Sequence, residues 1–262
     1  MANKLLLNYY DAVIYESDLS LLEYPTAWLN DATINFRLTR LQHNNNQHGD
    51  RSDGSVGKQS DLFLDPSVIS YLMHQCDEED EDFVDEVSNM HQAWDLSSTS
   101  HKRVFVPIND QFNASRTAFA KPGGGSHWSL LLWTITRNTS LSMPSCSFYH
   151  FDSSSGYNKT AALAVSQKLL KVLHCRSKSD LTNIDSINVN ECKTPQQNNA
   201  YDCGVYLLGF AEALSSVKDD LTSESCKEKY EETVSSYAGG DEFAVKLRQQ
   251  ICDDIRTLST CN

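Results

Sequence analysis

The chain has 262 residues, of which 40% are hydrophobic, so it can build a real core in one large domain or two small ones. Its net charge of −13 and scattered basic residues argue against nucleic acid as a partner, because phosphate binding needs clustered Lys and Arg. No apolar run approaches the length of a membrane span or a secretory signal, so we expect no membrane partner and a location in the cytoplasm or the nucleus.

The eight cysteines include no C-x-x-C pair and form no tight Cys/His cluster, which predicts neither a zinc site nor a redox dithiol. An even count would suit disulfides in a secreted chain, and sequons at Asn113, Asn138 and Asn158 would fit that alternative. Without a signal peptide such tripeptides carry no weight, so we expect reduced, buried cysteines.

The N-terminal part predicts a buried helix after Pro25, with Leu29, Ala32 and Phe36 on one stripe. The polar segment 43–61 is rich in Asn, Gly and Ser and is interpreted as a disordered insertion. A helix capped by Asp65 then leads into the acidic run 77–86, which is either a solvated surface or a docking patch for a basic partner.

Three apolar, β-rich segments follow at 102–110, 126–135 and 146–152, and we expect them to be neighbouring central strands. An amphipathic helix over 160–174 and a short strand over 184–190 come next. The chain closes with an apolar helix from Cys203 and a final helix with apolar residues at a spacing of four. Helices at both ends and strands in the middle predict an α+β fold, which we interpret as a single domain over 1–262.

Cys203 follows Asp202, a good N-cap residue, at the expected start of a helix, where the dipole and free amide groups stabilise a thiolate. Taken alone this is weak, because buried structural cysteines are far commoner than catalytic ones. His127 is the candidate base, since "KPGGGSHWSLLLW" places it where a glycine-rich loop meets a strand. Each also has an ordinary interpretation, as a core cysteine and a strand-end histidine.

Asp152 ends the next strand, where its carboxylate would orient the imidazole; otherwise it is a turn former. His150 competes as the base but lies inside that strand. Gln197, six residues before Cys203, offers an amide for an oxyanion hole shared with the backbone N–H of Cys203, and Gln196 is the neighbour to be distinguished from it.

The ordered set of His127-Trp128, Asp152, Gln197 and "YDCG" around Cys203 resembles the Ulp or sentrin-specific cysteine proteases, peptidase family C48. Within that family, "PIND", "GGGSHWSLL" and "QQNNAYDCGVY" look most like the deneddylases, which act on the Nedd/Rub modifier. The resemblance implies a papain-like α+β fold and cleavage after the C-terminal Gly-Gly of the modifier, in precursor processing or release from lysine. It implies no metal and no cofactor.

By the same resemblance, Trp28 and Trp128 cover a narrow channel for the glycine tail, and Asp31 in "AWLNDATINF" contacts the modifier. Without the resemblance, both tryptophans would be interpreted as core residues, and Asp31 as part of a local polar network. The expected partners are the modifier and its conjugates, such as neddylated cullins, bound by a monomer. The alternatives are a SUMO protease or deubiquitinase of the same fold, a degenerate modifier-binding module, and an acyltransferase of the same clan, for which no basic cluster suits a CoA phosphate.

Overall fold

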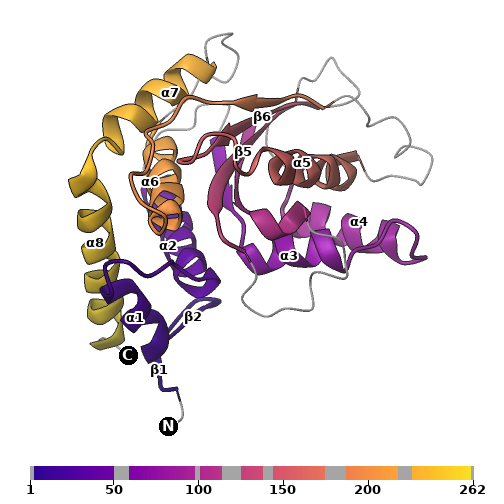
Figure 1. The fold of residues 1–262 in the computed structure, drawn as a ribbon. Coiled ribbons are helices and arrows are strands. Elements are labelled where there is room, and N and C mark those ends of the chain that lie inside the picture. The colour runs from indigo at the N-terminus through magenta and orange to yellow at the C-terminus, as the bar shows by residue number, and fades with distance from the viewer. Residues whose placement is uncertain are drawn as a thin grey trace.

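The computed structural model describes residues 3–49, 59–97, 101–113, 125–137, 144–174, 187–217 and 226–260. Figure 1 shows two groups of helices on either side of a central sheet. In chain order the elements are β1 (Leu5–Tyr9), β2 (Ala12–Tyr15), α1 (Glu16–Glu23), α2 (Asp31–Gly49), β3 (Gln59–Phe63), α3 (Pro66–His74), α4 (Phe83–Ala93), β4 (His101–Asn109), η1 (Asp110–Asn113), β5 (Trp128–Thr136), β6 (Ser145–Phe151), α5 (Lys159–His174), β7 (Val189–Glu191), α6 (Cys203–Ser215), α7 (Cys226–Tyr237) and α8 (Asp241–Thr260).

The main sheet has the order β3-β4-β5-β6-β7, so the three apolar segments are neighbouring central strands, as predicted. β4, β5 and β6 are antiparallel to one another, whereas the two edge strands run parallel to their neighbours. The expected α+β class is therefore confirmed. Among the described helices, none is long and apolar enough to cross a membrane.

Strand alternation divides the interior into two cores, because successive side chains point to opposite faces of the sheet. Leu130 and Leu132 of β5 belong to the core shared with α2, α6, α7 and α8. Leu131 and Trp133 belong to the core shared with α3, α4 and α5. Figure 1 shows α6 and α2 against one face and α5, α3 and α4 against the other. The start of α6 is thereby held against the sheet.

The ordered structure extends into the segment 43–61 from both sides, which corrects the interpretation of that whole segment as a disordered insertion. α2 continues to Gly49 and β3 begins at Gln59, while residues 50–58 lie outside the described part. Tertiary contacts explain the difference: the Gln42 side chain bonds to the backbone of β3, and Arg103 holds the Asp61 carboxylate through Nε and Nη2 at 2.8 and 2.7 Å.

The helix capped by Asp65 is confirmed, since its carboxylate accepts a hydrogen bond from the Ser67 amide at 2.7 Å. The acidic run is partly used within the molecule. Glu78 forms ion pairs with Lys168 and Lys171 of α5. These contacts join the run to the helical layer behind the sheet, which favours a structural role for part of it.

Candidate active site

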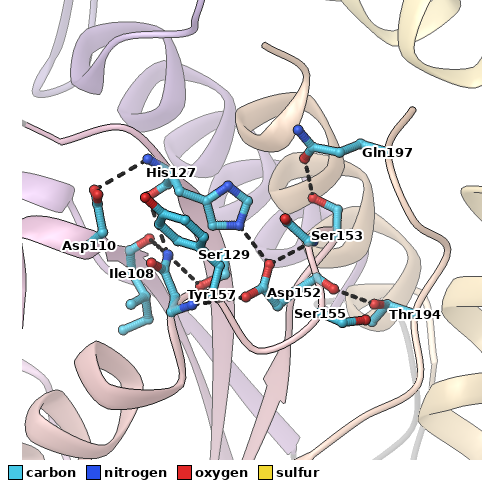
Figure 2. A network of polar contacts seen from close by, with 12 residues as sticks. Ile108, Asp110, His127, Ser129, Asp152, Ser153, Ser155, Tyr157, Thr194 and Gln197 are labelled. Carbon is cyan, nitrogen blue, oxygen red and sulfur yellow. Dashed lines mark hydrogen bonds and ion pairs between the residues drawn. The ribbon is translucent and has the colours of Figure 1, made fainter. Parts of the chain in front are cut away.

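The antiparallel pairing of β5 and β6 brings His127 and Asp152 together. Leu130 pairs with Phe151, so the start of β5 adjoins the end of β6. His127 precedes the first residue of β5 and Asp152 follows the last residue of β6. Their side chains meet in Figure 2, where His127 Nε2 lies 2.6 Å from Asp152 Oδ1. Both residues are buried, at 5% and 3% exposure, which shields the pair from water.

Asp152 is held as a carboxylate by three donors. Burial opposes its ionisation, but the His127 ring and the amide N–H groups of Asn158 and Ser154 keep its pKa below the usual value. The amide bonds measure 3.0 Å from Asn158 to Oδ2 and 2.9 Å from Ser154 to Oδ1. An ionised Asp152 can therefore orient the imidazole and stabilise its protonated form.

The protonated form of His127 is favoured by its two polar neighbours. Burial alone would lower the pKa of His127, yet hydrogen bonds to Asp152 and Cys203 and the charges of both raise it to about 9. Because Nε2 faces Asp152, Nδ1 is the ring nitrogen left for the thiol. The three side chains thus form the acid, imidazole and thiol series that nucleophilic catalysis requires.

The backbone around His127 is fixed from two sides. Asp110 Oδ1 accepts the amide N–H groups of Ser126 and His127, at 2.7 and 3.2 Å, as Figure 2 shows for His127. Gly125 has φ +111°, and a side chain at that position would run into Asn109 and Gln111. Only glycine suits this turn, which accounts for the glycine before Ser126.

Cys203 is the first residue of α6, and its side chain is 2% exposed. The first amide groups of a helix have no intrahelical partner, so the thiol lies where negative charge is favoured. Asp202 is the N-cap residue of this helix, as expected, but its side chain makes no capping bond. Instead its carboxylate pairs with Arg248 and accepts a bond from Asn199.

The two neighbouring glutamines have different surroundings. Gln197 Oε1 accepts from Ser153 Oγ at 2.6 Å, and Gln197 Nε2 donates to the Asn199 carbonyl at 2.6 Å. A primary amide has two N–H groups, so one donor of Gln197 is not used by that bond. Gln196 is turned to the loop after β6, where its Oε1 accepts from the amide and hydroxyl of Ser155.

The two predicted tryptophans differ in burial. Trp28 is 48% exposed, whereas Trp128 is 7% exposed and part of the core next to α6. The Trp128 indole donates to the Leu29 carbonyl at 3.2 Å and thereby joins β5 to the segment that carries Trp28. A Cβ added at Gly204 would lie 3.0 Å from Leu29 Cβ, so the glycine after Cys203 allows this segment to approach the thiol.

Asp31 is the first residue of α2 and is exposed, three positions after Trp28. Partial desolvation of the carboxyl and the charge of Asp65 raise the pKa of Asp31, in opposition to the helix dipole, which favours the ionised form. An exposed acid three residues after an exposed tryptophan suits contact with a basic, apolar partner surface.

His150, the competing base, bonds to side chains other than Asp152. It is fully buried, its Nε2 lies 2.9 Å from Ser129 Oγ, and its Nδ1 lies 2.9 Å from Glu191. The residue that the sequence interpretation missed is Asn158. Its amide nitrogen donates to the His127 carbonyl at 3.2 Å, while its backbone supports Asp152.

Asn158 is 1% exposed and its side-chain nitrogen is engaged, which removes its sequon as a glycosylation site. The available signal was a polar residue soon after a strand end, and that signal is too common in turns to select one position.

Comparisons with known proteins agree with this geometry. Residues 27–235 match the model of the Ulp1 protease family, C-terminal catalytic domain. Sentrin-specific protease 8 of Mus musculus is 34% identical over 209 residues, covering 79% of this chain and 76% of the relative. NEDD8-specific protease 1 of Arabidopsis thaliana is 29% identical over 212 residues, covering 80% and 74%.

The fold resembles that of the C-terminal Ulp1 protease domain solved in complex with SMT3, the yeast ortholog of SUMO. The TM-score is 0.59 at 18% identity, over 99% of this chain and 90% of the other.

Proposed function

The chain belongs to the Ulp1 protease family of cysteine proteases, and from that premise we propose that it cleaves after the C-terminal Gly-Gly of a Nedd8-type modifier. Both precursor processing and release from lysine are included. The observation that carries the proposal is the buried His127–Asp152 pair at 2.6 Å, with Cys203 among the groups that raise the pKa of the same ring. The name of one relative, NEDD8-specific protease 1 of Arabidopsis thaliana, supports the choice of modifier.

In the proposed reaction, the Cys203 thiolate attacks the carbonyl carbon of the last glycine, with His127 protonated beside it. The negative oxygen of the tetrahedral intermediate is held by the backbone N–H of Cys203 and the free amide proton of Gln197. His127 then gives its proton to the leaving amine, and the C–N bond breaks. Water, deprotonated by His127, attacks the thioester and releases the modifier with a free carboxylate and the thiol.

Selectivity for a glycine tail is assigned to exclusion by aromatic side chains. Trp28 would cover the tail from the exposed side, and Trp128 would hold the segment that carries it. A Gly-Gly backbone has no side chains to clash with such a cover, whereas larger residues would. Asp31 would pair with a basic residue of the modifier. We also propose that the protein acts as a monomer on conjugates such as neddylated cullins. Its proposed location is the cytoplasm or the nucleus.

A panel of modifiers carrying a C-terminal aminocoumarin amide tests the proposal directly. The Nedd8-type substrate should be cleaved with a kcat/KM well above those of the SUMO and ubiquitin substrates. A preference for SUMO or ubiquitin would select the alternative specificity. Binding of a modifier that bears a C-terminal electrophile, with no reaction at Cys203 and no cleavage of any substrate, would identify a degenerate binding module.

A further inference from the structure

Arg248, in the C-terminal helix α8, lies outside the segment that matches the family model and has no role in the reaction described above. Its side chain is nevertheless almost completely buried, at 6% exposure. A guanidinium cannot lose its charge in a protein, so its burial is costly unless several groups bond to it. Its partners therefore indicate what this position is for.

The partners of Arg248 lie on two segments that lead directly to active-site residues. Nε donates to Asp202 Oδ1 at 2.9 Å, next to the nucleophile in sequence. Nη2 donates to the carbonyls of Tyr201 at 3.3 Å and of Ala27 at 2.8 Å, and Ala27 precedes Trp28. One planar group thus joins the loop before Cys203 to the segment that carries Trp28.

The loop before Cys203 depends on such polar contacts because it has little packing. Within residues 193–201, all of which are described, no residue is fully buried. A cavity of about 720 Å³ lies against this loop and is lined by Asn199, Tyr201 and Arg248, among others. Apolar side chains therefore do not fill the space on that side. Hydrogen bonds are the main constraint on where the loop, and the cysteine after it, come to rest.

The hydrogen bonds continue from Arg248 to the proposed oxyanion donor. Asn199 Nδ2 donates to Asp202 Oδ2 at 2.8 Å, and Asn199 Oδ1 accepts the amide N–H groups of Tyr201 and Asp202 at 3.0 Å each. The Asn199 carbonyl in turn accepts from Gln197 Nε2 at 2.6 Å. A displacement at Arg248 is therefore transmitted to both Gln197 and Cys203.

We propose that Arg248 is a positioning residue for the protease reaction: from helix α8 it sets the placement of Cys203 and Gln197 relative to the Trp28 segment. This inference rests on the proposed function, because the proposed function assigns Cys203 and Gln197 their catalytic roles. The fork shape of the guanidinium matters here, because two carbonyls and a carboxylate on different segments require donors in a fixed plane.

A purely structural ion pair would give a different result, and a double variant separates the two roles. Arg248→Met leaves the Asp202 carboxylate buried without its cation, so it should lower the melting temperature and the activity together. Adding Asp202→Asn removes that buried charge, so the double variant should regain stability. The carbonyls of Ala27 and Tyr201 still lack their donor, so kcat/KM should remain about 10- to 100-fold below wild type, the cost typical of a small misplacement of reacting groups.

Arg37→Met is the matched control. Arg37 is also a buried arginine and pairs with Glu212, near the C-terminal end of α6, and with Asp254 of α8, but not with the loop before Cys203 or the Trp28 segment. It should lower the melting temperature while kcat and KM stay near wild type. Arg248→Lys keeps the charge beside Asp202 without the planar fork, so it should retain more stability than activity.

The measurements are the melting temperature, kcat and KM on the aminocoumarin substrate, and the alkylation rate of Cys203 by chloroacetamide, followed by peptide mass. Recovery of kcat/KM in the double variant along with stability would overturn the proposal, as would an equal kinetic loss in Arg37→Met. Persistent kinetic loss with slower alkylation supports it. If the wild type cleaves no modifier, the proposed function fails, and the positioning role of Arg248 is then tested by alkylation alone. An alkylation rate of Cys203 equal to wild type in the stable double variant would overturn that role.

Discussion

Replacing Asp152 by Asn tests the electrostatic origin of the high pKa of His127. The ordinary histidine pKa of 6.5 is raised to about 9, in spite of burial, by hydrogen bonds and charges from Asp152 and Cys203. At ~1.4 kcal/mol per pKa unit, this favours the protonated ring by about 3 kcal/mol. Asparagine keeps the shape of the aspartate side chain and can place one acceptor where Asp152 Oδ1 lies, 2.6 Å from His127 Nε2, but it removes the negative charge.

A hydrogen bond to a charged group contributes about 1.5–3 kcal/mol, roughly twice a neutral one. Losing the ionic part, about half of that energy, should therefore lower the pKa of His127 by about 0.5 to 1 unit. Because His127 must be protonated to release the amine, the alkaline limb of kcat/KM should move down from a pH near 9 by the same amount. The assay is a kcat/KM profile on the aminocoumarin substrate across that range.

Glu191→Gln is the control, because this carboxylate pairs with His150 rather than with the catalytic ring. Its alkaline limb should coincide with that of the wild type. If Asp152→Asn lowers the plateau but leaves the limb in place, the carboxylate does not set the proton affinity of His127, and the reasoning is refuted.

The same shift has a consequence for folding. A histidine whose pKa is raised in the folded state contributes stability that is complete below its unfolded value of 6.5 and is lost as the pH rises through about 9. Unfolding by urea at a series of pH values should show this loss in the wild type and a smaller one in Asp152→Asn.

Further predictions concern the nucleophile, the oxyanion donor and the cover of the channel. Cys203→Ala should abolish cleavage while a fluorescence titration still detects modifier binding, and residual turnover would refute its role. Gln197→Ala should lower kcat by about 100- to 1,000-fold, with Gln196→Ala much closer to wild type; the reverse ranking would exchange their roles. A modifier with alanine in place of its penultimate glycine should be cleaved roughly 5- to 150-fold more slowly, since overpacking costs about 1–3 kcal/mol. Trp28→Ala should reduce the difference in cleavage rate between the glycine and alanine modifiers. An unchanged ratio of the two rates would show that Trp28 does not cover the channel.

Local patterns in the sequence were sufficient for the elements and for the types of catalytic residue. The alternation over 102–110 and the β-rich apolar runs over 126–135 and 146–152 predicted the three central strands, because period and turn residues act within a few positions of the chain. A cysteine at a helix start, a histidine at a loop-strand junction and an acid at a strand end were visible for the same reason.

Contacts between distant residues were decided only by the tertiary structure. The register of β5 on β6, rather than residue type, placed His127 and not His150 beside Asp152. The Asp202 side chain does not cap α6, because α8 brings Arg248 to it from 46 positions along the chain. Such pairs depend on how whole elements pack, and no local period or turn signal specifies which buried charge will meet which partner.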